Sequence, residues 1–106
     1  MNSMKNIQKR VDEWFRQYKI NYWQPLEMLA RLTEENGELA RELNYRYGPK
    51  KKKAIEEPHN LGDEMADIIF SVVCLANSLD IDLDKHFNRV MDKCYGRDKD
   101  RWKNNT

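Results

Sequence analysis

The stretch LGDEMADIIFSVVCLANSL, residues 61–79, decides the fold class of this chain. Its uncharged part, residues 68–79, is apolar on almost every side of a helical wheel, which is typical of a buried, central helix. Two adjacent valines also suit a strand, but the length and continuity of the pattern favour a helix. The polar positions Glu64, Asp67 and Ser71 form one stripe along it. We therefore expect a buried central helix with a single acidic stripe.

Three further segments repeat apolar residues at the spacing of one helical face. In chain order, the apolar residues that mark them are Ile7, Val11, Trp14, Phe15 and Tyr18; Leu26, Leu29, Leu32, Ala40 and Leu43; and Leu83, Phe87, Val90, Met91 and Cys94. Pro25 suits the first turn of the second segment, and Gly48-Pro49 ends it. The sequence therefore predicts an all-α protein with a protomer like a four-helix bundle. We expect one domain over residues 1–106, with its core at 4–103 and a lysine-rich loop at 49–60.

Charge and composition exclude several classes of protein. The 19 basic and 18 acidic residues leave a net charge of +1, which gives no general attraction to nucleic acid. The uncharged run at 68–79 is shorter than the roughly 20 residues that span a bilayer, and residues 1–10 lack the apolar core of a signal peptide. Cys74 and Cys94 lie in helical patterns without paired spacing. We therefore expect reduced thiols in a cytoplasmic protein that binds neither nucleic-acid polymers nor membranes.

Two short acidic motifs contain the main candidate functional residues of the sequence. They are EENGE at residues 34–38 and EMAD at residues 64–67. In each motif, acids three residues apart lie on one face of a helix. If both pairs meet, four carboxylates gather in a small volume and repel one another unless a cation lies between them. Oxygen ligands of this kind suit Mg²⁺ or Mn²⁺, so the two motifs predict a metal site.

Each motif also has an ordinary explanation. The glutamates of the first can be solvated residues, because Arg31 and Arg41 lie at the spacing of helical ion pairs. Asp67 is harder to explain in this way, because it precedes the uncharged run and has no lysine or arginine within four residues. We expect Asp67 to be buried, and burying an unpaired carboxylate costs several kcal/mol. A bound cation removes that cost.

The order Glu-Glu-x-x-Glu, 25 residues, then Glu-x-x-Asp resembles the signature of the MazG-like nucleotide pyrophosphohydrolases. The flanking sequence is similar to that of the short, single-domain YpjD-type members of this family. The segments that carry this similarity are LTEENGELARE at 32–42, LGDEMADIIF at 61–70, CLANSLDI at 74–81 and RDKDRW at 97–102. The resemblance covers residues 4–103, nearly the whole chain.

The resemblance implies a helical bundle that forms dimers or tetramers and uses Mg²⁺, with Mn²⁺ as a substitute. It implies hydrolysis of nucleoside triphosphates to the monophosphate and pyrophosphate, a housekeeping reaction of the nucleotide pool. It assigns Glu35, Glu38, Glu64 and Asp67 as metal ligands, and it adds Glu34 to Glu35 and Glu38 as a catalytic residue that orients or activates water. The sequence itself is consistent with metal-dependent hydrolysis. It shows no Ser–His–Asp or Cys–His set for covalent catalysis, and its four scattered glycines cannot form a phosphate-binding loop.

Basic residues near the carboxyl end are candidates for binding the phosphates. Lys93 and Arg97 match family positions that reach the phosphates, and Arg101 lies beside them in sequence. Each can instead be a solvated residue at a helix end, where a cation is favourable. Asn77 matches a recurrent family asparagine, which either contacts substrate or satisfies a buried backbone group.

Aromatic residues are candidates for stacking on the base. Tyr22 and Trp23 precede the second helical segment, where they either line a nucleotide pocket or belong to the core.

Two other classes of function stay open. One is a non-catalytic helical dimerisation module with a solvated acidic face. The other is a ferritin-like metalloprotein, which is disfavoured because His59 and His86 form no Glu-x-x-His motif. Release of pyrophosphate that depends on Mg²⁺ separates the enzyme from both. Because four helices of this length cannot bury residues 61–79 and also enclose a nucleotide, we expect at least a dimer.

Overall fold

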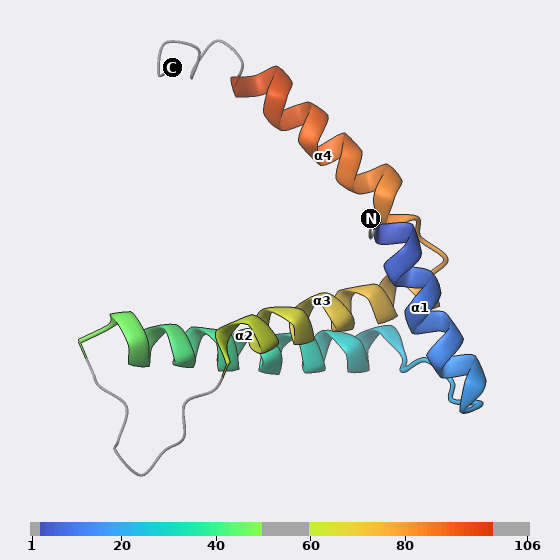
Figure 1. Cartoon of the computed structure of the whole chain (residues 1–106), viewed down its shortest axis with the longest axis horizontal. Helices are drawn as coiled ribbons and strands as arrows, with labels where there is room; N and C mark the ends of the chain where they lie inside the picture. The colour runs from blue at the N-terminus through green and yellow to red at the C-terminus, as the bar shows by residue number, and fades with distance from the viewer. Residues whose placement is uncertain (1–2, 50–59, 99–106) are drawn as a thin grey trace.

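The structure, a computed structural model, describes residues 3–49 and 60–98, and within them it contains four helices and no strand (Figure 1). In chain order the helices are α1 (Met4–Gln17), α2 (Pro25–Tyr47), α3 (Leu61–Ser78) and α4 (Leu83–Asp98). The predicted all-α class is confirmed, and α2 ends just before Gly48-Pro49 as expected. None of the described helices combines the length and apolar character that crossing a membrane requires. The lysines at 50–53 lie outside the described residues.

The first three helices begin at residues suited to a helix start. Ser3 precedes α1 and Asn60 precedes α3, and the side chain of each accepts a hydrogen bond at 3.1 Å from the backbone N–H three residues later. Pro25 is the first residue of α2, and the N–H of Gln24 donates to the carboxylate of Glu27 at 3.1 Å. Local sequence therefore sets where these helices begin.

Helices α1 and α3 end in the same way, at a residue in the left-handed region. These residues are Lys19, with φ of 54°, and Asp80, with φ of 57°. The isoleucine that follows each one donates its N–H at 2.9 Å to a carbonyl five positions earlier. Bonds of this kind satisfy carbonyl groups at the end of a helix and turn the chain sharply.

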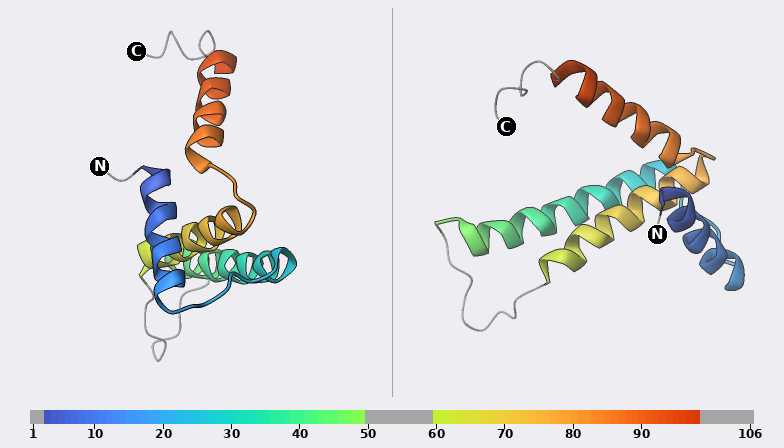
Figure 2. Two further views of the ribbon diagram at one scale, coloured as in Figure 1. Left: turned by 90° about the vertical axis from the view of Figure 1, so that its right-hand side faces the viewer. Right: turned by 45° about the horizontal axis from the view of Figure 1, so that its top comes forward.

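The core lies where α1 crosses the antiparallel pair α2 and α3 (Figures 1 and 2). Its centre is Phe15 from α1, Met28 from α2 and Cys74 from α3, all buried. Partly buried side chains that pack against this centre are Val11, Tyr22, Phe70 and Leu75. Cys74 and Cys94 are both free cysteines, as the sequence predicted.

A hydrogen-bond network ties α1, the connection before α2, and α3 to the start of α4. The Asn77 amide nitrogen donates at 3.0 Å both to the Gln8 carbonyl and to the Tyr22 hydroxyl, and its oxygen accepts from the Gln8 side chain at 3.0 Å. The Tyr22 hydroxyl donates to Asp12 at 2.8 Å. The Gln8 side chain also accepts the N–H of Leu83 at 3.0 Å. These bonds fix how three helices meet.

The Tyr22 phenol is the titratable group in this network that gives stability an alkaline limit. Burial, followed by the hydrogen bond to Asp12, raises the pKa of Tyr22 from 10.0 to about 12. Because the unfolded phenol ionises first, the stability from neutral Tyr22 is complete below pH 10 and is lost as pH rises toward 12. We expect Tyr22→Phe to lower the free energy of unfolding by about 1 kcal/mol at pH 7. In urea unfolding, the Tyr22→Phe variant should also lose less stability than the native chain between pH 10 and 12. Equal losses in both proteins would show that ionisation of Tyr22 does not cause the alkaline loss of stability.

Helix α4 projects away from α2 and α3 (Figures 1 and 2). It is anchored at its first turn, where the Asp84 carboxylate accepts the backbone N–H groups of Met4 and Lys5, each at 3.0 Å. Beyond this anchor its apolar side chains Phe87 and Val90 are 57% and 54% exposed. The four helices of one chain therefore do not close around a shared core.

Helix α3 is central but only partly buried in a single chain, and the sequence predicted that one chain could not bury it completely. Its sides toward α1 and α2 are covered, but Met65, Ile69 and Val72 on the remaining side are exposed, Ile69 at 49%. The physical reason is the direction of α4, which leaves this apolar side of α3 uncovered within the described residues.

Candidate metal centre

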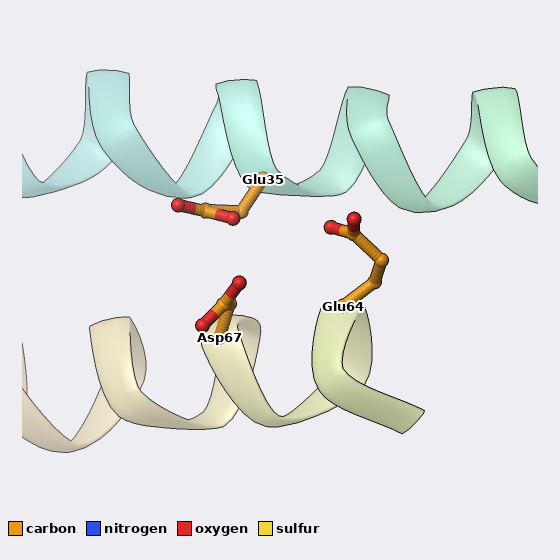
Figure 3. A group of neighbouring side chains, drawn as sticks. All are labelled: Glu35, Glu64 and Asp67. Carbon is orange, nitrogen blue, oxygen red and sulfur yellow. The ribbon is translucent and has the colours of Figure 1, made fainter. Parts of the chain in front are cut away.

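Three carboxylates from two helices converge between α2 and α3. Glu35 comes from α2, and Glu64 and Asp67 come from α3 (Figure 3). Each offers one carboxylate oxygen, and the three oxygens all lie within 4.8 Å of one another. The antiparallel packing of α2 on α3 thus brings together three of the four residues predicted as metal ligands.

The three carboxylates differ in burial, and not in the way the sequence suggested. Asp67 is exposed, so the expectation that it is the buried acid is wrong. Glu64 is the buried one, at 7% exposure, and Glu35 is partly buried. The side chains of Glu64 and Asp67 both point toward α2 (Figure 3), so which of the two is buried depends on how the helices pack and not on the neighbouring sequence.

Electrostatic strain within the group appears at Glu35. Burial raises the pKa of Glu35 above its ordinary value, and the charges of Asp67, Glu38 and Glu64 raise it further. The positive charge of Arg31 acts in the opposite direction, with a nitrogen 3.8 Å from a Glu35 oxygen. Negative charge therefore exceeds positive charge around Glu35, which is the condition that a bound cation relieves.

The donor set fits a hard divalent ion. All three candidate ligands are carboxylates, and they come from two rigid helices, so their positions do not depend on a loop. Mg²⁺ and Mn²⁺ prefer oxygen ligands, and Mg²⁺ is commonly held by a few carboxylates together with substrate phosphates. The residues present are those that such an ion requires.

The other acids of α2 lie outside the three-carboxylate group. Glu38 is exposed, although its charge contributes to the raised pKa of Glu35, and Glu34 is exposed as well. Glu42, which the sequence did not single out, is buried at 3% exposure and pairs with Arg46 at 3.1 Å. Its spacing of seven residues from Glu35 is the signal that places it on the same side of α2.

The family of the chain follows from its match to known proteins. Residues 24–102 match the model of the MazG nucleotide pyrophosphohydrolase domain. The chain belongs to this family. Membership makes it a pyrophosphohydrolase, and it weighs against a non-catalytic dimerisation module and against a ferritin-like metalloprotein.

Relatives and solved structures cover nearly the whole MazG chain. It is 56% identical over 100 residues to the uncharacterised protein YpjD of Bacillus subtilis strain 168, which covers 94% of the chain and 90% of YpjD. A crystal structure of YpjD has a TM-score of 0.78 at 53% identity, covering 88% of this chain and 93% of that one. A crystal structure of a Bacillus-conserved MazG protein, a nucleotide pyrophosphohydrolase, has a TM-score of 0.77 at 46% identity, with 94% and 97% covered.

The predicted phosphate-binding residues do not lie near the carboxylates of the same MazG chain. Lys93 and Arg97 are exposed on α4, which projects away from α2 and α3 (Figure 1). Arg101 lies outside the described residues. The structure therefore leaves Lys93 and Arg97 to act on a site other than that of their own chain, or not at all.

The predicted base-binding residues have different surroundings. The Tyr22 ring stacks on Phe15 with centroids 4.3 Å apart, and its hydroxyl bonds to Asp12 and Asn77. Both Tyr22 and Asn77 thus serve the fold, and their direct contact with substrate stays a prediction. Trp23 is 38% exposed and meets the Phe15 ring edge-on at 5.9 Å, so it has surface to offer a base.

Arg31 is a basic neighbour of the site, and its predicted ion pair with the glutamates of α2 is present, to Glu35. Its guanidinium carbon lies 5.4 Å from the centre of the Trp23 ring, and its nitrogen lies 3.8 Å from Glu35. Burial raises the pKa of the Cys74 thiol to about 11, and the charge of Arg31 opposes that rise. The spacing of four residues predicted the ion pair with Glu35, but not the contact with the Trp23 ring.

Proposed function

We propose that this MazG chain hydrolyses nucleoside triphosphates, canonical or modified and including deoxynucleotides, to the monophosphate and pyrophosphate with Mg²⁺. Mn²⁺ serves as a substitute, and the reaction is housekeeping of the cytoplasmic nucleotide pool. The observation that supports this most strongly is the convergence of Glu35, Glu64 and Asp67 within 4.8 Å. Family membership supplies the reaction class, and the carboxylates supply a place for the ion.

The chain holds the ion through the carboxylates of α2 and α3. Glu35, Glu64 and Asp67 bind it, and Glu38, whose charge already acts on Glu35, completes the set. A divalent ion there supplies the positive charge that neutralises the triphosphate and makes a nearby water easier to deprotonate. Glu34 orients the attacking water and takes its proton. The oxygen of water then bonds to the α-phosphorus, the anhydride bond between the α- and β-phosphates breaks, and pyrophosphate leaves.

The nucleotide is held by residues on both sides of the carboxylates. Trp23 stacks on the base, because its ring is partly exposed and lies beside Arg31, which itself contacts Glu35. Lys93 and Arg97 reach the phosphates from the α4 of a second subunit, since α4 points away from the carboxylates of its own chain. A site of this kind is complete only in an oligomer, either a dimer or a tetramer.

The apolar faces of α3 and α4 support this oligomer. Met65, Ile69 and Val72 form an exposed apolar stripe on α3, and Phe87 and Val90 form another on α4. Neither stripe is covered by described residues of the same chain. Packing the α4 of one subunit against the α3 of another buries both stripes, and homodimers of this kind are the commonest protein oligomers.

A panel of triphosphates tests the proposed reaction. The full-length chain is incubated with canonical and modified ribo- and deoxyribonucleoside triphosphates in Mg²⁺, in Mn²⁺ and in chelator, and pyrophosphate and phosphate are measured separately. We expect pyrophosphate with at least one nucleotide, no phosphate, and no turnover in chelator. Release of phosphate alone, or turnover that persists in chelator, would contradict the proposal.

A further inference from the structure

Arg31 occupies the position between the exposed aromatic ring and the carboxylate group. Its guanidinium lies over the Trp23 ring, 5.4 Å from the ring centre, and one nitrogen lies 3.8 Å from Glu35. One side chain thus links the predicted base-stacking surface to the candidate metal ligands. In a nucleoside triphosphate, the group between the base and the metal-bound phosphates is the ribose with its α-phosphate.

The ion pair between Arg31 and Glu35 is weak enough to break when another group binds to Glu35. At 3.8 Å it is an ion pair too long for a hydrogen bond, and the Arg31 side chain is 45% exposed. Although the Glu35 side chain is only 14% exposed, the exposed arginine can turn away from it without breaking a hydrogen bond. A divalent ion that recruits the Glu35 carboxylate competes with Arg31 for the same negative charge.

An arginine released in this way is well suited to bind phosphate. Its planar guanidinium carries five N–H donors, which match the oxygens of a phosphate group. The Trp23 ring stays beside it as a cation–π partner and limits the directions in which the guanidinium can point. Movement away from Glu35 therefore leaves Arg31 near the place where the ribose ends and the phosphates begin.

We infer that Arg31 is a substrate-binding residue that pairs with Glu35 in the free chain and contacts the α-phosphate when nucleotide and metal are bound. This inference rests on the proposed function and deepens it, because it assigns one residue to the phosphate that stays with the monophosphate product. Arg31 should therefore discriminate between the two products. Nucleoside monophosphate keeps the α-phosphate, whereas pyrophosphate does not.

Calorimetric binding of the two products tests this assignment without relying on turnover. dAMP, dCMP, dGMP and dTMP, and separately inorganic pyrophosphate, are titrated in Mn²⁺ into the native chain, Arg31→Ala and Arg31→Lys. We expect Arg31→Ala to weaken binding of the preferred monophosphate roughly 10- to 100-fold, as for a lost charged hydrogen bond, and to change pyrophosphate binding less than about twofold. Arg31→Lys should restore part of the monophosphate affinity.

Arg41 provides the matched control on the same helix. Its guanidinium also lies over an aromatic ring, 5.5 Å from the centre, but that ring is Tyr45 of the same helix and not the Trp23 ring beside Arg31. Arg41→Ala should bind both products like the native chain. Equal weakening of monophosphate and pyrophosphate in Arg31→Ala would show that Arg31 only positions Glu35, and would overturn the inference.

Two further outcomes separate this inference from the proposed function. Unchanged monophosphate affinity in Arg31→Ala, or a native chain that binds no monophosphate, overturns the inference even if triphosphates are hydrolysed. A native chain that binds monophosphate through Arg31 but releases no pyrophosphate from any triphosphate overturns the function and leaves the binding assignment standing.

Discussion

Asp67→Asn should lower the turnover of a nucleoside triphosphate at least about a hundredfold, because it removes a charged ligand from the three-carboxylate group. Asparagine keeps the shape of the side chain, and position 67 is exposed, so the helices should form as before. The rate is measured as pyrophosphate release at saturating Mg²⁺, with far-ultraviolet circular dichroism and thermal unfolding to show that the fold is intact. Glu38→Gln should lower turnover to a similar extent if Glu38 completes the set.

Asp63→Asn is the matched control for the change at Asp67. Asp63 lies one turn earlier on α3 and loses the same charge on substitution, but its carboxylate is not part of the group formed with Glu35. The turnover of the Asp63→Asn variant should stay within about threefold of the native value. Full activity in Asp67→Asn would show that Asp67 is not a metal ligand. Equal losses of turnover in both variants would show that the loss of one negative charge on α3, and not the loss of a metal ligand, lowers the rate.

Ile69→Lys should convert the oligomer into monomers and lower turnover at least about tenfold. The side chain is 49% exposed on the apolar stripe of α3, so a lysine costs little in one chain but places an unpaired charge in the proposed interface. Sedimentation at micromolar concentration measures the association, and pyrophosphate release measures the activity. Tyr18→Lys is the control, since Tyr18 is similarly exposed but lies at the end of α1, away from the α3 stripe.

A mixture of two inactive variants distinguishes a shared site from a site within one chain. Asp67→Asn lacks a metal ligand, and Lys93→Ala lacks the proposed phosphate contact from α4. If subunits share sites, co-expressed chains should recover about one quarter of the native sites, because about half of the random dimers pair the two variants, and each of these has both defects in one site and leaves the other site intact. Activity no greater than the sum of the separate variants would contradict sharing, and a native chain that sediments as a monomer would contradict the oligomer itself.

The helices and the acidic face were predictable from local sequence. Pro25 and Gly48-Pro49 bound α2, and the polar stripe within residues 61–79 correctly placed Glu64 and Asp67 on one side of a helix. Such features depend on helical period and on capping, which act over a few residues. For the same reason, the all-α class did not require knowledge of tertiary contacts.

Features that depend on how the helices pack were not predictable in this way. The direction of α4, whose first turn is anchored by the Asp84 bonds to the start of α1, could not be predicted from local patterns, and neither could the side of α3 that it leaves exposed. Burial was assigned to Asp67 instead of Glu64, because which carboxylate the packed helices cover is a tertiary property. The ion pair of Arg31 with Glu35 was predicted from helical spacing, but its contact with Trp23 was not, because that ring lies in a loop before α2, eight positions away.

Titration with Mn²⁺ tests most directly whether the carboxylates of α2 and α3 bind a divalent ion. Free Mn²⁺ is followed by electron paramagnetic resonance as it is added to the native chain, to Asp67→Asn and to Asp63→Asn. We expect at least one ion bound per native chain, similar binding in Asp63→Asn, and an affinity at least about tenfold weaker in Asp67→Asn. Equal Mn²⁺ affinity in the native chain and in Asp67→Asn would show that the ion, if bound, is held elsewhere.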